Sequence, residues 1–91
     1  MNLSKMRTKM DKVNRKLILL LAKRLKVAKK IAKIKKAEGL LVLDSKREQD
    51  QLDSIKNMAV ECQLDPVFVE EFFQELVSYT RSQMEIEMRM K

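Results

Sequence analysis

The first 37 residues carry an apolar side chain at nearly every third or fourth position, the spacing of a helix that packs lengthwise against another helix. Ile18, Leu21 and Ala28 widen this stripe into a surface suited to a protein core. Gly39, the only glycine, follows directly and predicts the end of the helix. The sequence therefore predicts one long helix, about 50 Å in length. We call its apolar positions the seam: Leu3, Met6, Met10, Val13, Leu17, Leu20, Val27, Ile31 and Ile34.

Two shorter helices are predicted after Gly39. The second begins at Asp44 or Ser45, because Ser45 and Glu48 have the spacing of a capping box, in which each side chain binds a free backbone N–H of the other residue. Pro66, at the first helical position after an aspartate cap, starts the third. The predicted fold class is all-α, a single domain over residues 1–91 with helices at 3–38, 45–63 and 66–88.

A second helix about half as long as the first cannot cover the whole seam. A chain of 91 residues also buries only a thin core by itself. Two copies that pair their long helices would cover the seam, so we expect a homodimer.

The composition excludes several kinds of site. The chain has no histidine and one cysteine, Cys62, so it can form neither an internal disulfide nor a cysteine cluster for zinc. We expect Cys62 to be a buried, inert residue, because it falls on the apolar stripe of the second helix. No cofactor or metal is expected. Neither a signal peptide nor a membrane span is predicted, since the apolar run 17–22 is too short, and the expected compartment is the cytoplasm.

The charge is divided unevenly along the chain. Residues 1–37 carry 14 lysines and arginines against one acid, Asp11, whereas residues 38–91 hold 6 basic and 12 acidic residues. This asymmetry favours an anionic partner: nucleic acid, a membrane surface, the acidic half of the chain itself or a small anion. A nucleic-acid-binding module stays an alternative, but the basic residues lack interleaved aromatics and no nucleic-acid motif is apparent, so we expect neither nucleic acid nor membrane as partner.

Arg24 interrupts the seam where an apolar residue is due. It could extend to solvent or specify the helix register. Alternatively it holds an anion, because burying an unpaired guanidinium costs several kcal/mol. Lys35 lies only about 20° away around the helix, with Val27 and Ile31 as an apolar wall between them. Arg7 lies about 25 Å along the axis, so it can join the same site only from an antiparallel second copy.

Asp44, Arg47 and Glu48 share one face at the start of the second helix. A cap with an ion pair explains them without a ligand. Together with the arginines and lysine of the first helix, however, they form a pattern that resembles the all-helical class of chorismate mutases over nearly the whole chain. The matching segments are MRTKMDKVNRKLILLLAKRLKVAKKIAKIKK, DSKRE and LDPVFVEEFFQELV.

This resemblance implies an intertwined homodimer that rearranges chorismate, a dicarboxylate, to prephenate. That reaction requires no nucleophile, metal or proton transfer. The family pattern also has a glutamine or glutamate on the third helix, where this chain has Met84 with Gln83 beside it. An isochorismate pyruvate-lyase-like enzyme and an inactive relative are the alternatives. The implied roles are carboxylate binding by Arg24 and the second copy's Arg7, a bond from Lys35 to the ether oxygen, acceptance of the ring hydroxyl by Glu48, support from Arg47 and Asp44, and the family's serine-like position at Thr80.

Overall fold

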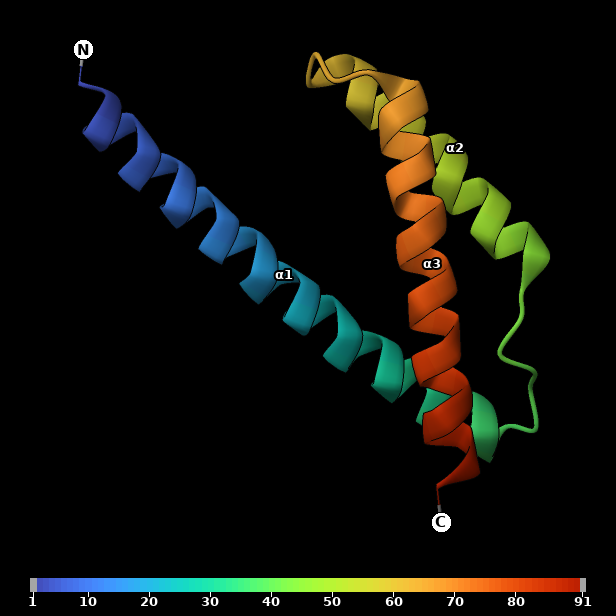
Figure 1. Ribbon diagram of the computed structural model, residues 1–91. Coiled ribbons are helices and arrows are strands. Elements are labelled where there is room, and N and C mark those ends of the chain that lie inside the picture. Colours follow the sequence, from blue (N-terminus) through green and yellow to red (C-terminus); the bar gives the residue numbers. More distant parts are fainter. Residues whose placement is uncertain (1, 91) are drawn as a thin grey trace.

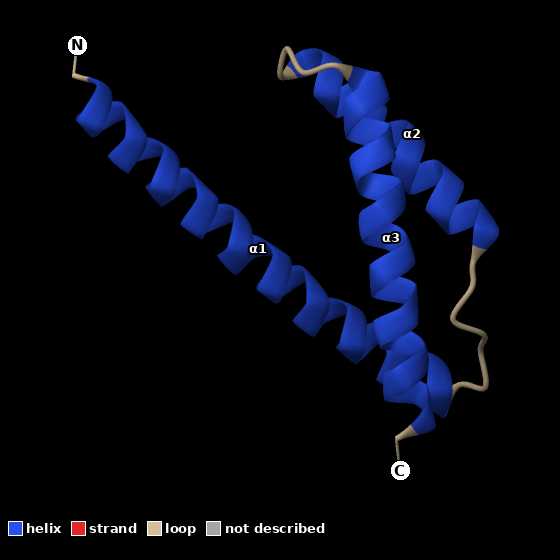
Figure 2. Ribbon diagram, in the orientation of Figure 1, coloured by secondary structure: helices blue, strands red, loops and turns tan. Residues whose placement is uncertain are grey.

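The computed structural model describes residues 2–90 and contains three helices and no strand in that range (Figures 1 and 2). The all-α fold class is therefore confirmed. The molecule is elongated, with extents of 56 × 28 × 15 Å. Its helices are α1 (Leu3–Ala37), α2 (Ser45–Glu61) and α3 (Pro66–Arg89).

Gly39 ends α1 through its backbone conformation. Its φ of 71° lies in the left-handed region that glycine adopts without a steric penalty. The Gly39 N–H donates to the Lys36 carbonyl at 3.2 Å, and the Leu40 N–H donates to the Lys35 carbonyl at 2.7 Å. This pair of bonds satisfies carbonyls that have no partner within the helix. The chain can then leave α1 and cross to α2.

Asp44, rather than Ser45, caps the N-terminus of α2. Its Oδ1 accepts a hydrogen bond from the Arg47 N–H at 3.0 Å. The predicted capping box of Ser45 and Glu48 was wrong, because Asp44 takes the cap and the Glu48 carboxylate binds Arg81 on α3 instead. Asp44 thereby fixes the first turn of α2, from which Arg47 and Glu48 project.

The C-terminus of α2 lies two residues before its predicted end. Gln63 adopts a left-handed φ of 60°, and the Leu64 N–H donates to the Ala59 carbonyl at 2.8 Å. Cys62 is the C-cap residue and is exposed, so the expectation of a buried cysteine was wrong. Asp65 then accepts from the Val67 N–H at 2.9 Å and begins α3.

The last helix, α3, packs against both α1 and α2 (Figure 1). Where it crosses α1, Ala28 and Ala32 lie against Met84, and Val42 and Met88 cover this cluster. The two alanines carry little side-chain volume, which lets the helices approach closely. This crossing holds the C-terminal half of α1 beside α3 and opposite the start of α2.

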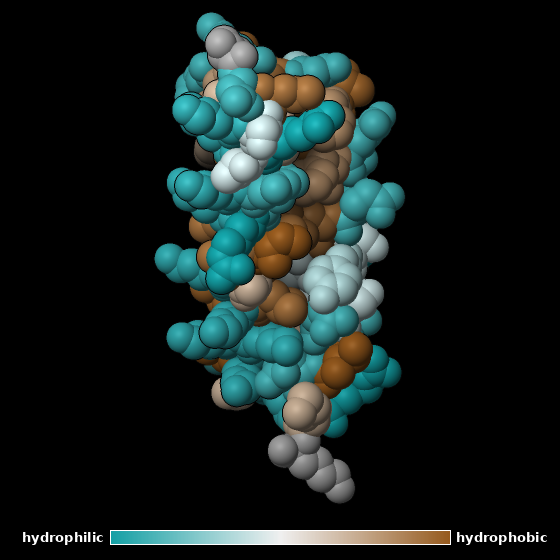
Figure 3. Space-filling view, turned by 60° about the vertical axis from the view of Figure 1, so that its left-hand side comes forward, coloured by the Kyte–Doolittle hydropathy of each residue, from teal (hydrophilic) through white to brown (hydrophobic). Residues whose placement is uncertain are grey.

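The N-terminal half of α1 extends away from the other two helices (Figure 1). Figure 3 shows apolar side chains, coloured brown, in a band between charged ones, coloured teal. No helix of residues 2–90 is long and apolar enough to span a membrane. Six seam residues on this half are between 36% and 64% exposed: Leu3, Met6, Met10, Val13, Leu17 and Leu20.

Candidate active site

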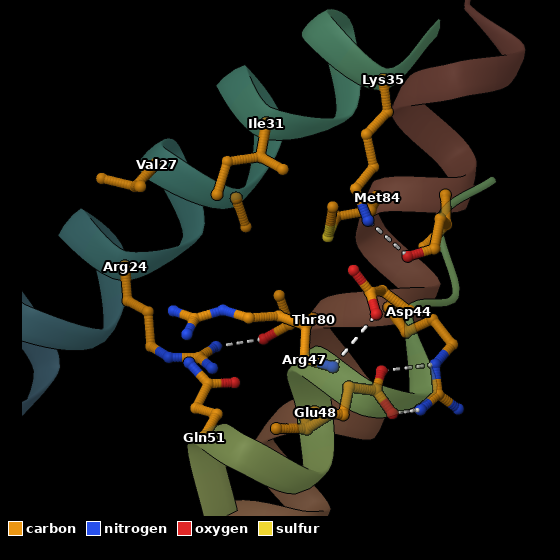
Figure 4. A pocket seen from close by; sticks show the side chains of 14 residues that line it. Arg24, Val27, Ile31, Lys35, Asp44, Arg47, Glu48, Gln51, Thr80 and Met84 are labelled. Atoms are coloured by element: carbon orange, nitrogen blue, oxygen red, sulfur yellow. Dashed lines mark hydrogen bonds and ion pairs between the residues drawn. The ribbon is translucent and has the colours of Figure 1, made fainter. Parts of the chain in front are cut away.

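A cavity of about 300 Å³ lies between the C-terminal half of α1, the first turns of α2 and the middle of α3 (Figure 4). Side chains from all three helices and from the segment that joins α1 to α2 form its walls. Its lining residues are Arg24, Val27, Ala28, Ile31, Lys35, Val42, Asp44, Arg47, Glu48, Gln51, Val77, Thr80, Arg81 and Met84.

Arg24 enters the cavity from α1 without a carboxylate partner among residues 2–90. Its Nη1 donates to the Thr80 Oγ1 at 2.5 Å, and the Thr80 hydroxyl donates in turn to the Leu76 carbonyl at 2.7 Å. Desolvation lowers the pKa of the Arg24 guanidinium below its usual value. A half-buried cation oriented by a neutral hydroxyl retains unused N–H donors, so this end of the cavity is suited to an anion.

Lys35 lies further along the same face of α1 (Figure 4). Its Nζ donates to the Val42 carbonyl at 2.8 Å, which leaves two of the three ammonium protons for a ligand. Val27 and Ile31 line the wall between the two cations. The cavity therefore has two separate positive groups with apolar surface between them.

Arg47 and Asp44 come from the start of α2. The Arg47 side chain lines the cavity and has no carboxylate partner among the described residues. The Asp44 carboxylate accepts from the Arg47 backbone N–H, so it orients the helix turn that carries the guanidinium. Arg47 is thus a third cation that remains free for an anionic ligand.

Glu48 and Arg81 form the only ion pair between two cavity residues within residues 2–90. Arg81 donates twice to Glu48, from Nε to Oε1 at 3.2 Å and from Nη2 to Oε2 at 2.5 Å. This bond with Glu48 raises the pKa of Arg81 above its usual value. Sequence reasoning missed Arg81 because the contact joins residues 33 positions apart. Gln51 was also missed, although it follows Arg47 by one helical repeat.

Met84 occupies the wall for which the sequence left Met84 and Gln83 as candidates. It lines the cavity, is 9% exposed and packs against Ala28 and Ala32. Gln83 does not line the cavity. This wall therefore presents a thioether, which is at most a weak hydrogen-bond acceptor.

Arg7 does not line this cavity. It is exposed on the part of α1 that extends away from α2 and α3. Of the residues proposed from the sequence for the site, six line the cavity within one chain: Arg24, Lys35, Asp44, Arg47, Glu48 and Thr80.

The charges define what the cavity can hold. Four cations and two carboxylates line it, giving a net formal charge of +2. No group of three or more histidine, cysteine or acidic side chains suited to a metal ion occurs in residues 2–90. The arrangement can therefore bind and orient a small dianion and stabilise negative charge that develops on it.

Comparisons with known proteins point in the same direction. The family described as chorismate mutase type II matches residues 6–85. A protein of Methanocaldococcus jannaschii named chorismate mutase is 30% identical over 80 residues, an alignment that covers 88% of this chain and 81% of the relative. The matched residues include every residue that lines the cavity.

Proposed function

Because the chain belongs to the chorismate mutase type II family and is therefore a chorismate mutase, an isomerase, we propose that the cavity between its three helices is the active site. The observation that carries this proposal is the set of three cations, Arg24, Lys35 and Arg47, that face one cavity without carboxylate partners in the described chain. Chorismate carries two carboxylates and an ether oxygen, which are acceptors of the kind that free cations bind.

The rearrangement is intramolecular, so the site has two tasks. It must fold a flexible dianion into the reactive chair, and it must stabilise the charge that moves during the reaction. The bond to the ether oxygen breaks ahead of carbon–carbon bond formation, so negative charge develops on that oxygen. Lys35 is proposed to donate to it, because a fixed ammonium stabilises this oxygen more strongly in the transition state than in the ground state.

The other residues are proposed to hold the substrate. Arg24, oriented by Thr80, binds one carboxylate, and Arg47 supports the charge network at the start of α2. Glu48 accepts from the ring hydroxyl, and Asp44 maintains the helix turn that carries Arg47. The apolar surface of Val27 and Ile31 packs against the ring and excludes water from it.

A homodimer is proposed to complete the site. The free half of α1 exposes six seam residues, which gives a continuous apolar face that a second copy can cover. If the second α1 runs antiparallel, its Arg7 approaches the cavity that contains Arg24 of the first chain. Each site then contains Arg24 of one chain and Arg7 of the other, one for each substrate carboxylate. One straight helix cannot place both arginines at the same site, because they lie about 25 Å apart along its axis.

The direct test measures the loss of chorismate absorbance and the appearance of prephenate. Arg24→Ala is expected to lower kcat/KM about 100-fold or more, because it removes a charged donor from a desolvated site, worth roughly 3 kcal/mol. Arg15→Ala is the matched control, since Arg15 is exposed and lies about half a turn around α1 from Arg24. Full activity of Arg24→Ala would exclude this cavity as the active site.

A further inference from the structure

Arg81 differs from the other cations of the cavity in already having a partner. Its guanidinium meets both oxygens of Glu48, whereas Arg24, Lys35 and Arg47 meet no carboxylate in residues 2–90. We propose that Arg81 is a positioning residue: it holds Glu48 at a fixed orientation and keeps that carboxylate away from the three cations that bind substrate. This inference rests on the proposed function, because it assigns a role within the same site.

The first argument is the number of acceptor positions on Glu48. Each oxygen of an ionised carboxylate has about two lone-pair positions. Arg81 occupies one on each oxygen through Nε and Nη2. One position per oxygen remains, so Glu48 can still accept a hydrogen bond from a hydroxyl group of a ligand. The two parallel bonds also fix the plane of the carboxylate, which a single bond from a lysine would not do.

The second argument concerns competition inside the cavity. Two acids line the cavity: Asp44, whose carboxylate accepts from the Arg47 backbone N–H, and Glu48, which is next to Arg47 in sequence. A free Glu48 side chain would be attracted to Arg47 or to the cations of α1 and would occupy donors that the substrate carboxylates need. It would also repel a dianion. Arg81 removes both effects, because it neutralises Glu48 from the α3 side.

The third argument separates this role from a purely structural one. The Arg81 and Glu48 side chains are 35% and 25% exposed, so solvent screens their attraction. Ion pairs with this degree of exposure contribute little to the stability of a fold. A strong effect of Arg81 on catalysis with a small effect on unfolding is therefore the expected signature of positioning.

The experiment is a double-mutant cycle on the full chain. Arg81→Met, Glu48→Gln and the double variant are assayed for kcat and KM with chorismate. Arg81→Met is expected to lower kcat/KM about 10-fold or more, largely through a raised KM. Glu48 then competes with the substrate for the protein cations that bind it. In the Glu48→Gln background the same substitution should change kcat/KM less than about twofold. Arg81→Lys should recover only part of the loss, because it restores the charge without the two parallel bonds.

Arg89→Met is the matched control on α3, since Arg89 is exposed and does not line the cavity. Thermal unfolding of each variant checks that the fold is retained. Equal losses from Arg81→Met in both backgrounds would overturn the inference, because Arg81 would then act independently of Glu48, and so would an unchanged kcat/KM. If the proposed function itself failed, Arg24→Ala would also leave turnover unchanged. If only this inference failed, Arg24→Ala would still abolish most activity.

Discussion

Replacing Met84 with glutamine is expected to raise the turnover of this enzyme. Met84 packs in a cluster that Val42 covers, and the Val42 carbonyl accepts from Lys35, so Met84 lies near the proposed ether-oxygen donor. The family pattern has glutamine or glutamate at this position, whereas the thioether donates no hydrogen bond. In the Met84→Gln variant, the new side-chain amide would give the ether oxygen a second donor beside Lys35.

The size of the gain follows from measured effects of single donors. Removing one donor from a developing oxyanion typically costs about 3–4 kcal/mol, or roughly 100- to 1,000-fold in kcat. The gain here should be smaller, about 10- to 100-fold, because Lys35 already binds the same oxygen and the new amide must find its geometry in a core packed for methionine. The substitution should also lower the free energy of unfolding by about 1 kcal/mol. Position 84 is only 9% exposed, and an amide there replaces an apolar group against Ala28 and Ala32.

Two variants control this prediction. Met84→Leu retains an apolar side chain of similar volume and should show no gain in kcat. Gln83→Met should leave turnover unchanged, because Gln83 does not line the cavity. The readouts are kcat and KM from chorismate absorbance, with the unfolding temperature of each variant. An unchanged kcat for a folded Met84→Gln variant would refute the reasoning. A loss of turnover in Gln83→Met would show that Gln83 supplies the donor instead.

Two further predictions concern the dimer and the α2–α3 turn. An equimolar mixture of Arg7→Ala and Arg24→Ala chains, unfolded and refolded together, should recover about a quarter of wild-type activity, because half of the dimers are mixed and one of their two sites is intact. No recovery above the separate variants would contradict donation of Arg7 across the dimer. Gln63→Gly should raise the free energy of unfolding by about 0.5–1 kcal/mol, since glycine removes the left-handed strain at φ 60° but also loosens the unfolded chain. Denaturant midpoints at a fixed protein concentration measure this change, and a lowered midpoint would contradict it.

Local signals in the sequence account for the helices. The seam, the single glycine and the aspartate before Pro66 predict an all-α fold, and the structure confirms that class. The prediction of a capping box at Ser45 was wrong because either Asp44 or Ser45 can cap the helix. Ser45 forms a capping box only if the Glu48 side chain is free to bind the backbone of its own helix. It is not free, because Arg81 binds it from α3. Burial of Cys62 failed for a related reason: α2 ends at Glu61, so its apolar stripe stops before the cysteine.

Some contacts in the cavity likewise follow from helical spacing in the sequence, whereas others depend on how the helices pack. Arg24 and Lys35 are eleven residues apart on one helix, so helical geometry alone aligns them, and both line the cavity. The Glu48–Arg81 bond instead depends on how α2 crosses α3, and no spacing in the sequence encodes that crossing. The same crossing decides whether Glu48 is free to pair with the protein cations that bind the substrate. A binding site for a dianion needs cations that have no carboxylate partner within the protein. A carboxylate placed in the same cavity to recognise another group of the ligand can pair with those cations and make them unavailable. Pairing Glu48 with a cation from a third helix resolves this conflict, because the acid stays in the cavity while Arg24, Lys35 and Arg47 remain free.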